Sequence, residues 1–553
     1  MKLLSLEFKH YLVIIVAVCL VISVFTTSVS WIDPTDYGLA SELPITFWIG
    51  LFLLGCLWYV GKDSRNFLIV SLVLSVCYLY FAPAIIRATP WISNSFYPFA
   101  ESLLINEQGH LVDRSTALFV SYVDWPIFLY LASAITLVTG IPHNILLSFF
   151  PPLIVSLYGF FTVLILKDKL KLSYSLFAAA FVVGSLFVRQ IYFGPQAVAY
   201  VFFLMALLLI KWIFFEDRGN LKLLGLLVFV CLVTTATHQL TSLMIMFLMF
   251  AVYLSYRFSS RKSTAIVFSL SIFLVVVWVG YNMYLAPGFF VTTVRHMSAI
   301  LFGESELSLY NEPTRIIGSQ PMLANFVASW GIVLLGVAVS LIGIFQIIRS
   351  ILARRTYENL PFAVFMVFAL AFFGLFAVAG EYGAHEAYQR AFMFGLVPIS
   401  YLAVRVLSKK PKLLVLLVVV LLFLNIPAQY GGDTYRMATQ PQLAGSNFVA
   451  DTSPDEIDVV GKFTLYVRFY DPDKVINVVP IGLDFPYTTF NSSAVDEAID
   501  EALTKVDYVT LSGLQTNYYK YFLGLDPLQD VDFDAKCNRI YANSQFTVFK
   551  PIN

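Results

Sequence analysis

LKLLGLLVFVCLVTTATHQLTSLMIMFLMFAVYLSY (Leu221–Tyr256) is an apolar run of about 36 residues with a single charged side chain, Lys222. A membrane-spanning helix needs about 20 apolar residues, so the run has room for two short crossings. Basic segments lie at both of its ends, EDRGNLK at the start and YRFSSRK at the finish. Because Lys and Arg close to span ends stay on the cytoplasmic side, both ends belong to one side. We therefore predict two spans, with the reversal at TATHQLT and His238 at the outer surface.

The composition of the whole chain is typical of an integral membrane protein. Of its 553 residues, 59% are hydrophobic and only 13% are charged, with a mean hydropathy of +0.78. Soluble domains carry about 25% charged residues. The formal net charge of +0 indicates neither a nucleic acid nor an acidic partner. The five Cys residues show neither a disulfide framework nor metal-ligand spacing, so we expect no metal.

The same length criterion, applied along the chain, predicts an α-helical polytopic membrane protein with about 13 transmembrane helices. The predicted spans are Tyr11–Ser30, Ile45–Val60, Phe67–Ile86, Ile145–Leu166, Tyr174–Val188, Pro195–Phe215, Leu221–Thr237, Leu240–Tyr256, Ala265–Tyr284, Leu323–Ile348, Pro361–Gly380, Ala391–Leu407 and Leu413–Ile426. They make up a transmembrane domain over residues 1–426, with a long loop at 87–142.

WPIFLYLASAITLVTG (Trp125–Gly140) is the other segment on which the topology depends. As a span it would move the basic loop KDKLK (Lys167–Lys171) to the outside, and it is short and starts with Trp-Pro. We therefore predict a helix in the outer membrane interface. With this choice every basic loop lies on one side, which places the N-terminus in the cytoplasm and the C-terminal region outside a cell membrane.

The tail, residues 427–553, loses the long apolar runs and gains Asp and Glu. Four stretches rich in β-branched and aromatic residues predict strands, the last of them a hairpin with Asn-Ser at its turn. These stretches are FTLYVRF, KVINVVPI, VDYVTLS and RIYANSQFTVFK. SSAVDEAIDEALTK (Ser492–Lys505) predicts a helix capped by Ser. The tail is thus predicted to be a small external α/β domain.

Polar residues gather on the predicted outer side, where we look for a single site. Ionisable groups at membrane depth are costly and indicate function by default. Glu101 and Asp124 are candidate catalytic bases for an acceptor hydroxyl, with solvation of the loop as the alternative. Arg189 and Arg390 lie at span ends, where Arg can bind a lipid phosphate or form a structural ion pair. Five further candidates for substrate binding come from the same loops: Gln196, His238, Arg295, Glu381 and His385. For His238, satisfying backbone groups at the turn is an equally good explanation.

The order of these features resembles the GT-C superfamily of polytopic glycosyltransferases, which includes protein O-mannosyltransferases and aminoarabinose transferases. A span, a long external loop, the WPIFLYLASAITLVTGI segment and a span that ends in basic residues follow one another. The phrases IYFGPQAVAYVFFLMAL, THQLTSLM, RAFMFGLVP and YVTLSGLQTNYYKYFLGLDPL look like archaeal proteins of this type. The similarity covers most of the chain as loose phrases rather than one diagnostic motif.

The resemblance implies transfer of a sugar from a polyprenyl- or dolichyl-phosphate donor to a glycan, lipid or protein acceptor at the outer face. It implies no cofactor beyond this donor lipid, and membrane lipids as surroundings. GT-C enzymes usually carry an acidic residue just after the span that precedes the first loop, where this chain has Ser93 or Asn94. Either Glu101 or Asp124 then supplies the base, or the activity is altered.

Three other functions stay open at this point. An oligosaccharide polymerase or ligase also uses external Arg residues, although its main loop usually comes later in the chain. A lipid or glycan transporter would carry charges in mid-span or paired broken helices, and the predicted spans have few charges in their middles. A non-catalytic membrane scaffold would suit the absent acidic residue.

Overall fold

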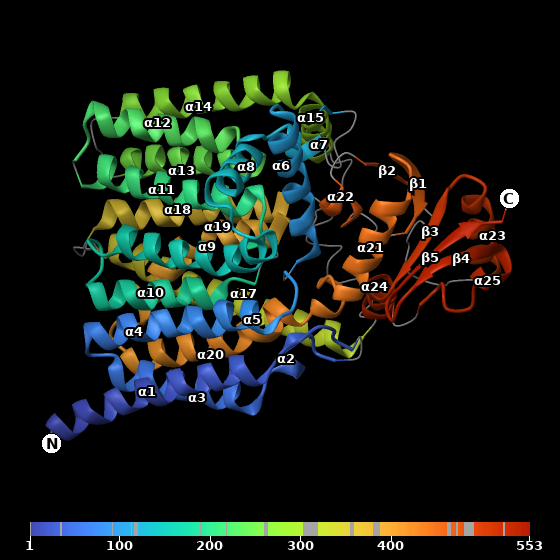
Figure 1. Cartoon of the computed structure of the whole chain (residues 1–553). Coiled ribbons are helices and arrows are strands. Elements are labelled where there is room, and N and C mark those ends of the chain that lie inside the picture. The colour runs from blue at the N-terminus through green and yellow to red at the C-terminus, as the bar shows by residue number, and fades with distance from the viewer. Residues whose placement is uncertain are drawn as a thin grey trace.

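A computed structural model gives the arrangement of the chain (Figure 1). It describes residues 2–552 except 34–35, 91, 112, 115–119, 188–190, 217, 259–263, 302–318, 354–358, 380–386, 462–465, 472–473, 480–491 and 524–525. The helices up to the C-terminal domain are α1 (Lys2–Thr26), α2 (Leu39–Glu42), α3 (Ile45–Gly61), α4 (Arg65–Val76), α5 (Ala82–Ile86), α6 (Phe96–Gln108), α7 (Val120–Val123), α8 (Ile127–Thr139), α9 (His143–Leu166), α10 (Leu172–Ser185), α11 (Pro195–Ile210), α12 (Leu221–Thr235), α13 (Gln239–Phe258), α14 (Thr264–Leu285), α15 (Pro287–Leu301), α17 (Gln320–Leu352), α18 (Leu360–Ala379), α19 (Ala387–Leu407) and α20 (Pro411–Tyr430). Short π-helices, η1 (Cys77–Phe81) and η4 (Lys211–Phe215), continue α4 and α11.

The protein is an α-helical membrane protein. Among the described residues, ten helices are long and apolar enough to cross a membrane. They are α1, α4 with its extension to Ile86, α9, α11 with η4, α13, α14, α17, α18, α19 and α20. The shorter apolar helices α3, α10 and α12 run beside them in Figure 1 and match three more predicted spans. The count of 13 crossings stays a prediction, because these three helices are shorter than a full span.

The predicted reversal inside Leu221–Tyr256 is present. α12 ends at Thr235, α13 begins at Gln239, and the two helices pack against each other. His238 supplies the cap, since its Nδ1 accepts the backbone N–H of Thr241 in the first turn of α13 at 3.3 Å. A polar residue thus satisfies one of the amides that every helix start leaves open.

The predicted interfacial helix is also a helix, α8. One of its faces is buried and packs against α6, where Asn106 donates to the hydroxyl of Thr136 at 3.0 Å. The other face exposes apolar side chains, among them Leu137 at 66% and Val138 at 84%. The exposed apolar face suits a membrane interface, although the depth of α8 in a bilayer stays a prediction.

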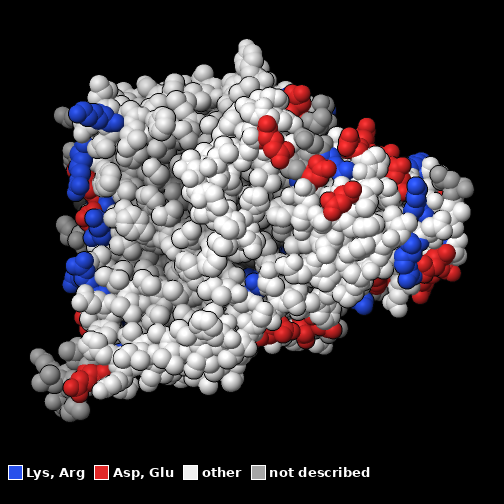
Figure 2. Space-filling model, viewed as in Figure 1, with Lys and Arg blue, Asp and Glu red and all other residues white. Residues whose placement is uncertain are grey.

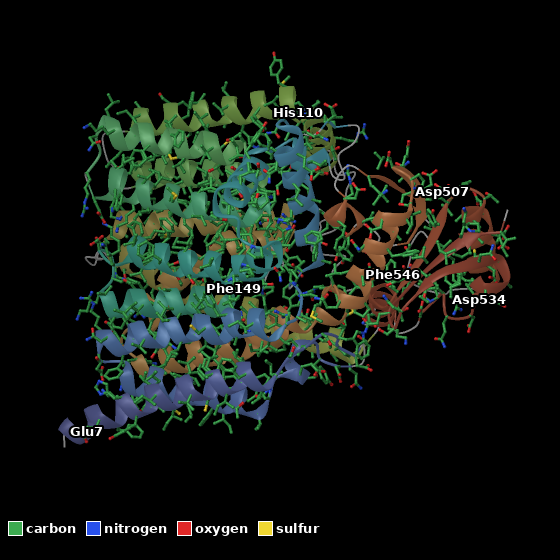
Figure 3. The ribbon with its side chains drawn as sticks, viewed as in Figure 1. Glu7, His110, Phe149, Asp507, Asp534 and Phe546 are labelled. Atoms are coloured by element: carbon green, nitrogen blue, oxygen red, sulfur yellow. The ribbon has the colours of Figure 1, made fainter. Side chains whose placement is uncertain are left out.

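The two ends of the helical bundle differ in charge. Lys and Arg gather along the end opposite the C-terminal domain (Figure 2). Lys167 follows α9 directly, Lys171 precedes α10, and Arg257 and Arg349 lie in the last turns of α13 and α17. Glu7 lies towards this end, whereas His110, Asp507 and Asp534 lie towards the other (Figure 3). We call these the basic end and the domain end.

α10 is shorter than a full span because the helix ends at Ser185, inside the bundle. Its last carbonyl groups are buried, and a buried carbonyl needs a donor. Tyr80 donates to the carbonyl of Val183 at 2.8 Å, and Asn425 donates to those of Gly184 at 3.2 Å and Leu186 at 2.6 Å. These bonds satisfy the last carbonyl groups of α10 and let the helix end at Ser185.

The C-terminal domain is a small α/β unit, as predicted. Its elements are η5 (Asp433–Tyr435), α21 (Gln440–Thr452), β1 (Glu456–Val460), α22 (Val467–Tyr470), β2 (Val475–Val478), α23 (Ser492–Leu503), β3 (Tyr508–Ser512), α24 (Gly513–Leu523), α25 (Phe533–Lys536), β4 (Cys537–Ala542) and β5 (Phe546–Pro551). The sheet order is β2-β1-β3-β5-β4, with β2, β1 and β3 parallel and β5 antiparallel to β3 and β4. α21 lies close to β5, since a Cβ at Gly445 would overlap the ring of Phe546.

Two details of this domain differ from the sequence prediction. FTLYVRF was predicted to be a strand, but its end belongs to helix α22 and residues 462–465 lie outside the described part. The strand of this region is β1, which the prediction missed because Glu456 and Asp458 make it look like a loop. In addition, α20 continues to Tyr430, four residues past the predicted domain boundary at 426.

Buried contacts join the loop after α5 to the start of the C-terminal domain. Arg87, 5% exposed, donates through Nε and Nη2 to Oδ2 of Asp433, the first bond at 3.1 Å. The guanidinium also lies 4.7 Å from the ring centre of Tyr430. Further along, the N–H of Ser93 donates to the carbonyl of Arg436 at 2.9 Å. The domain is therefore held against the bundle by the loop that precedes α6.

Candidate functional site

Three of the predicted site residues meet at the domain end of the bundle. Arg390, in the first turns of α19, donates through Nη1 to Oε1 of Gln196, the second residue of α11. The positive charge of Arg390 also acts on His238, before α13. We call Arg390, Gln196 and His238 the donor cluster.

The neighbouring helices fix the donor cluster in place. Gly194 precedes α11 and Pro195 is its first residue, a position for which Pro is preorganised. One turn further, the hydroxyl of Tyr200 on α11 donates to the carbonyl of Met393 on α19 at 2.8 Å. α11 also packs against α13. Three helices therefore begin next to one another, and their N-terminal dipole ends carry partial positive charge.

The donor cluster is rich in hydrogen-bond donors. Nε2 of Gln196 is buried and has no hydrogen-bond partner among the described residues. Nδ1 of His238 accepts the amide proton of Thr241, so a neutral ring carries its proton on Nε2. Burial, and then the charge of Arg390, hold the pKa of His238 well below its ordinary value. His238 is therefore a neutral donor at physiological pH.

Two tyrosines extend the cluster, and no sequence pattern distinguishes them among the 31 tyrosines of the chain. Tyr122, in α7, and Tyr192 share a hydrogen bond between their hydroxyls. Burial raises the pKa of Tyr122 well above its ordinary value, and the hydroxyl of Tyr97 raises it further, whereas Arg390 lowers it. The hydroxyl of Tyr122 thus stays protonated beside the donor cluster.

Asp124 lies next to this region. The N–H of Ile127, three residues later, donates to the carbonyl of Ala236 in the turn that contains His238, at 3.3 Å. Asp124 pairs with Nη2 of Arg114 at 2.5 Å, and its side chain is 8% exposed. Burial raises the pKa of Asp124, while the charge of Arg114 and its hydrogen bond oppose this shift. The result is a carboxylate that is more basic than an exposed one.

Glu101 has a different environment. It is completely buried on α6, and Oε1 lies 3.6 Å from Nη1 of Arg468 in the C-terminal domain, which is 3% exposed. Tyr97 precedes it by one turn on the same helix, so Glu101 borders the tyrosines rather than the donor cluster itself. Its buried ion pair ties α6 to α22, and its role as a base stays a prediction.

The other predicted residues are not brought together by the described part of the chain. Arg295 lies on α15 with an exposed side chain. α15 packs against the residue after Asp124, because the rings of Phe289 and Trp125 lie 5.4 Å apart between centres. Arg189, Glu381 and His385 lie outside the described residues.

No family model matches this chain, and no curated protein is significantly similar to it. The chemistry of the site therefore rests on its own geometry. Positive potential, neutral donors and a basic carboxylate lie together at one end of a membrane bundle. Such a set can bind an anion and accept a proton from a group bound beside it.

Proposed function

We propose that this protein is a membrane glycosyltransferase of the GT-C type. It transfers a sugar from a polyprenyl- or dolichyl-phosphate donor to a hydroxyl acceptor at the outer membrane face. The observation that carries the proposal is the donor cluster at three adjacent helix starts. The order of loops and spans in the sequence supports the same family.

The donor phosphate binds at the donor cluster. A cation in the first turns of a helix is disfavoured by the helix dipole, yet Arg390 occupies such a position in α19. A phosphate would compensate this potential and accept from Arg390, from Nε2 of Gln196 and from Nε2 of His238. Arg390 then stabilises the negative charge that grows on the phosphate as the sugar leaves.

Asp124 is the better-placed of the two candidate bases. Its raised pKa improves it as a proton acceptor, and the bond from the N–H of Ile127 to the carbonyl of Ala236 keeps its segment beside the turn of His238. The acceptor oxygen forms a bond to the anomeric carbon while the bond from this carbon to the phosphate oxygen breaks. The acceptor proton moves to Asp124, and the lipid phosphate leaves with the electron pair.

The orientation follows from the charge at the two ends. Basic residues gather at the end opposite the C-terminal domain, and Lys and Arg favour the cytoplasm (Figure 2). We therefore place the N-terminus in the cytoplasm of a cell and the C-terminal domain outside. The acceptor, a glycan, a lipid or a protein, reaches the site from that side.

The test is transfer of a radiolabelled sugar from a polyprenyl-phosphate donor by the purified protein in lipid nanodiscs. Arg390→Ala should lower transfer by about 100-fold or more, the usual effect of removing one charge-stabilising donor. Arg390→Lys keeps a point charge but loses bidentate geometry, so it should retain part of the activity. Arg405→Ala, at the other end of α19, is the matched control and should transfer normally.

Three outcomes would contradict the proposal. If Arg390→Ala folds and transfers as well as Arg405→Ala, the donor cluster does not hold the phosphate. If the native protein moves a labelled polyprenyl-phosphate sugar across the bilayer without cleaving it, the protein is a transporter. Extension of an existing glycan by whole repeat units would instead indicate a polymerase or ligase.

A further inference from the structure

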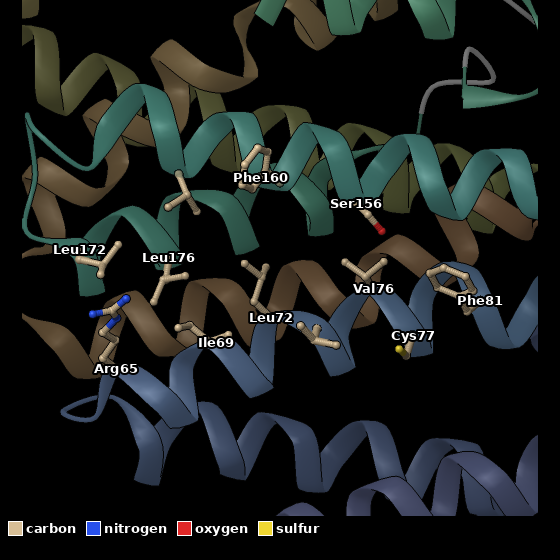
Figure 4. A pocket seen from close by; sticks show the side chains of 13 residues that line it. Arg65, Ile69, Leu72, Val76, Cys77, Phe81, Ser156, Phe160, Leu172 and Leu176 are labelled. Atoms are coloured by element: carbon tan, nitrogen blue, oxygen red, sulfur yellow. The ribbon is translucent and has the colours of Figure 1, made fainter. Parts of the chain in front are cut away.

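A cavity separate from the donor cluster lies between α4 with η1, α9 and α10 (Figure 4). Its volume is about 360 Å³, within the range of about 300–1,000 Å³ that small-molecule sites occupy. It is lined from Arg65, at the basic end, to Phe81, in η1. None of its lining residues belongs to the donor cluster or to its tyrosines.

The cavity is a groove on the outside of the bundle. Its rims carry apolar side chains that are partly exposed, with Ile69 at 38%, Val73 at 56% and Phe160 at 57%. Its floor includes Leu176, which is 4% exposed. Apart from Arg65, its lining side chains carry no charge. In a membrane this surface faces lipid, so a hydrocarbon chain is the natural filling.

Two exposed cations lie at the basic end of the groove. Arg65 is exposed in the first turn of α4, and its side chain points towards Leu172 at the start of α10 (Figure 4). Lys171, the residue before α10, is exposed as well. Neither Arg65 nor Lys171 has an ion pair within the described part of the chain.

The acidic residues of the adjoining loops have partners of their own. Asp63 lies 3.5 Å from Lys62, and Asp168 lies 2.7 Å from Lys211. Charge at the mouth of the groove is therefore left for an anion from outside the chain. Basic pockets between transmembrane helices bind the head groups of anionic lipids.

We propose that this groove binds an anionic phospholipid. Its phosphate is held by Arg65 and Lys171, and one of its chains lies along the groove towards Phe81. From Arg65 to Phe81 the helix rises by about 24 Å. Half of the hydrocarbon core measures about 15 Å, so a chain that starts at the basic end stays inside the groove through its leaflet. This site is independent of the proposed transferase function.

Lipid retention tests the proposal. The full-length protein is purified in detergent, incubated with phosphatidylglycerol, passed through a sizing column and analysed for bound lipid by mass spectrometry. Diacylglycerol supplies the chains alone, and inorganic phosphate supplies the anion alone. We expect retention of phosphatidylglycerol, with diacylglycerol at least about tenfold weaker and no competition by inorganic phosphate at millimolar concentration.

Two variants and two matched controls complete the experiment. Arg65→Ala should weaken retention by about tenfold or more, the effect of one lost charge-assisted hydrogen bond. Ser156→Trp fills the groove and should abolish retention. Lys222→Ala removes an exposed charge at the start of α12, and Leu157→Trp enlarges a side chain of α9 outside the lining; both should retain lipid.

The proposal is overturned if Arg65→Ala, whose side chain is exposed and whose removal leaves the core intact, retains as much lipid as the native protein. It is also overturned if the two controls lose as much as the two groove variants, or if diacylglycerol binds equally well. The retention assay measures no sugar transfer, and Arg65 and Ser156 lie outside the donor cluster, so a failure here is distinguishable from a failure of the transferase proposal.

Discussion

The buried ion pair of Arg87 and Asp433 predicts a large and asymmetric cost of breaking it. Their side chains are 2% and 0% exposed, and removing one partner of such a pair typically costs about 3–5 kcal/mol. Arg87 keeps a bond to the carbonyl of Pro83 at 3.3 Å and the ring of Tyr430 when Asp433 is lost. Asp433→Asn should therefore lie at the lower end of this range, and Arg87→Met at the upper end.

The assay is denaturant unfolding in detergent micelles, followed by brief proteolysis that cleaves only unfolded chains. The double variant Arg87→Met, Asp433→Leu should recover most of the loss, because an apolar pair has no charge to desolvate. Glu501→Gln is the control. It breaks an exposed pair between Glu501, on α23 of the C-terminal domain, and Lys505, just after that helix, and should leave stability unchanged.

The reasoning would be refuted by either of two results. One is a loss of less than about 1 kcal/mol in the free energy of unfolding of both single variants, since a buried charge without its partner destabilises the fold by more than this. The other is additivity, in which the double variant loses the sum of the single effects. Residues in direct contact should instead show a coupling free energy of about 0.5–3 kcal/mol or more.

Three further predictions concern the site. The pKa of His238 is lowered in the folded protein, so the unfolded chain binds more protons below pH 6.5. The free energy of unfolding should therefore fall as the pH drops through that value, and His238→Gln should flatten this part of a stability–pH curve. Arg114→Ala removes the group that lowers the pKa of Asp124, so the acid limb of the pH–rate profile should move to higher pH, and an unmoved limb would exclude Asp124 as the base. Glu101→Gln should loosen the C-terminal domain and expose it to protease. If the pair is structural, the second change Arg468→Met should restore both protease resistance and sugar transfer. If sugar transfer stays lost in a stable double variant, Glu101 is the base.

The sequence predicted the helical architecture well because the membrane imposes it. Backbone groups in hydrocarbon must bond within their own segment, so long apolar runs become helices regardless of their neighbours. The reversal at His238 was predictable from a second effect of the membrane, which keeps the basic segments at both ends of one apolar run on the same side. In the C-terminal domain tertiary packing decides which segments form strands. There the end of FTLYVRF is helix α22 rather than a strand, and β1 was not predicted.

The donor cluster was predictable only residue by residue. Arg390, Gln196 and His238 are separated by long stretches of sequence, and nothing in their spacing shows that α11, α13 and α19 begin side by side. Tyr122 and Tyr192 could not be found at all, because their identity as site residues comes from contacts and from no pattern. Arg87 carried a signal as a lone Arg at a span end, but its partner Asp433 lies 346 positions away in the chain.

The two kinds of buried polar contact at the domain end differ in their net charge. Arg87 with Asp433 and Glu101 with Arg468 each join a cation to a carboxylate across two parts of the chain, so their charges cancel. The donor cluster joins Arg390 to the neutral amide of Gln196 and faces a neutral His238, and its helix starts add further positive potential. A charged pair that cancels holds the C-terminal domain in place, whereas a cation bonded to a neutral amide keeps its charge and favours a nearby anion. This difference is why we assign structure to the first two contacts and phosphate binding to the third.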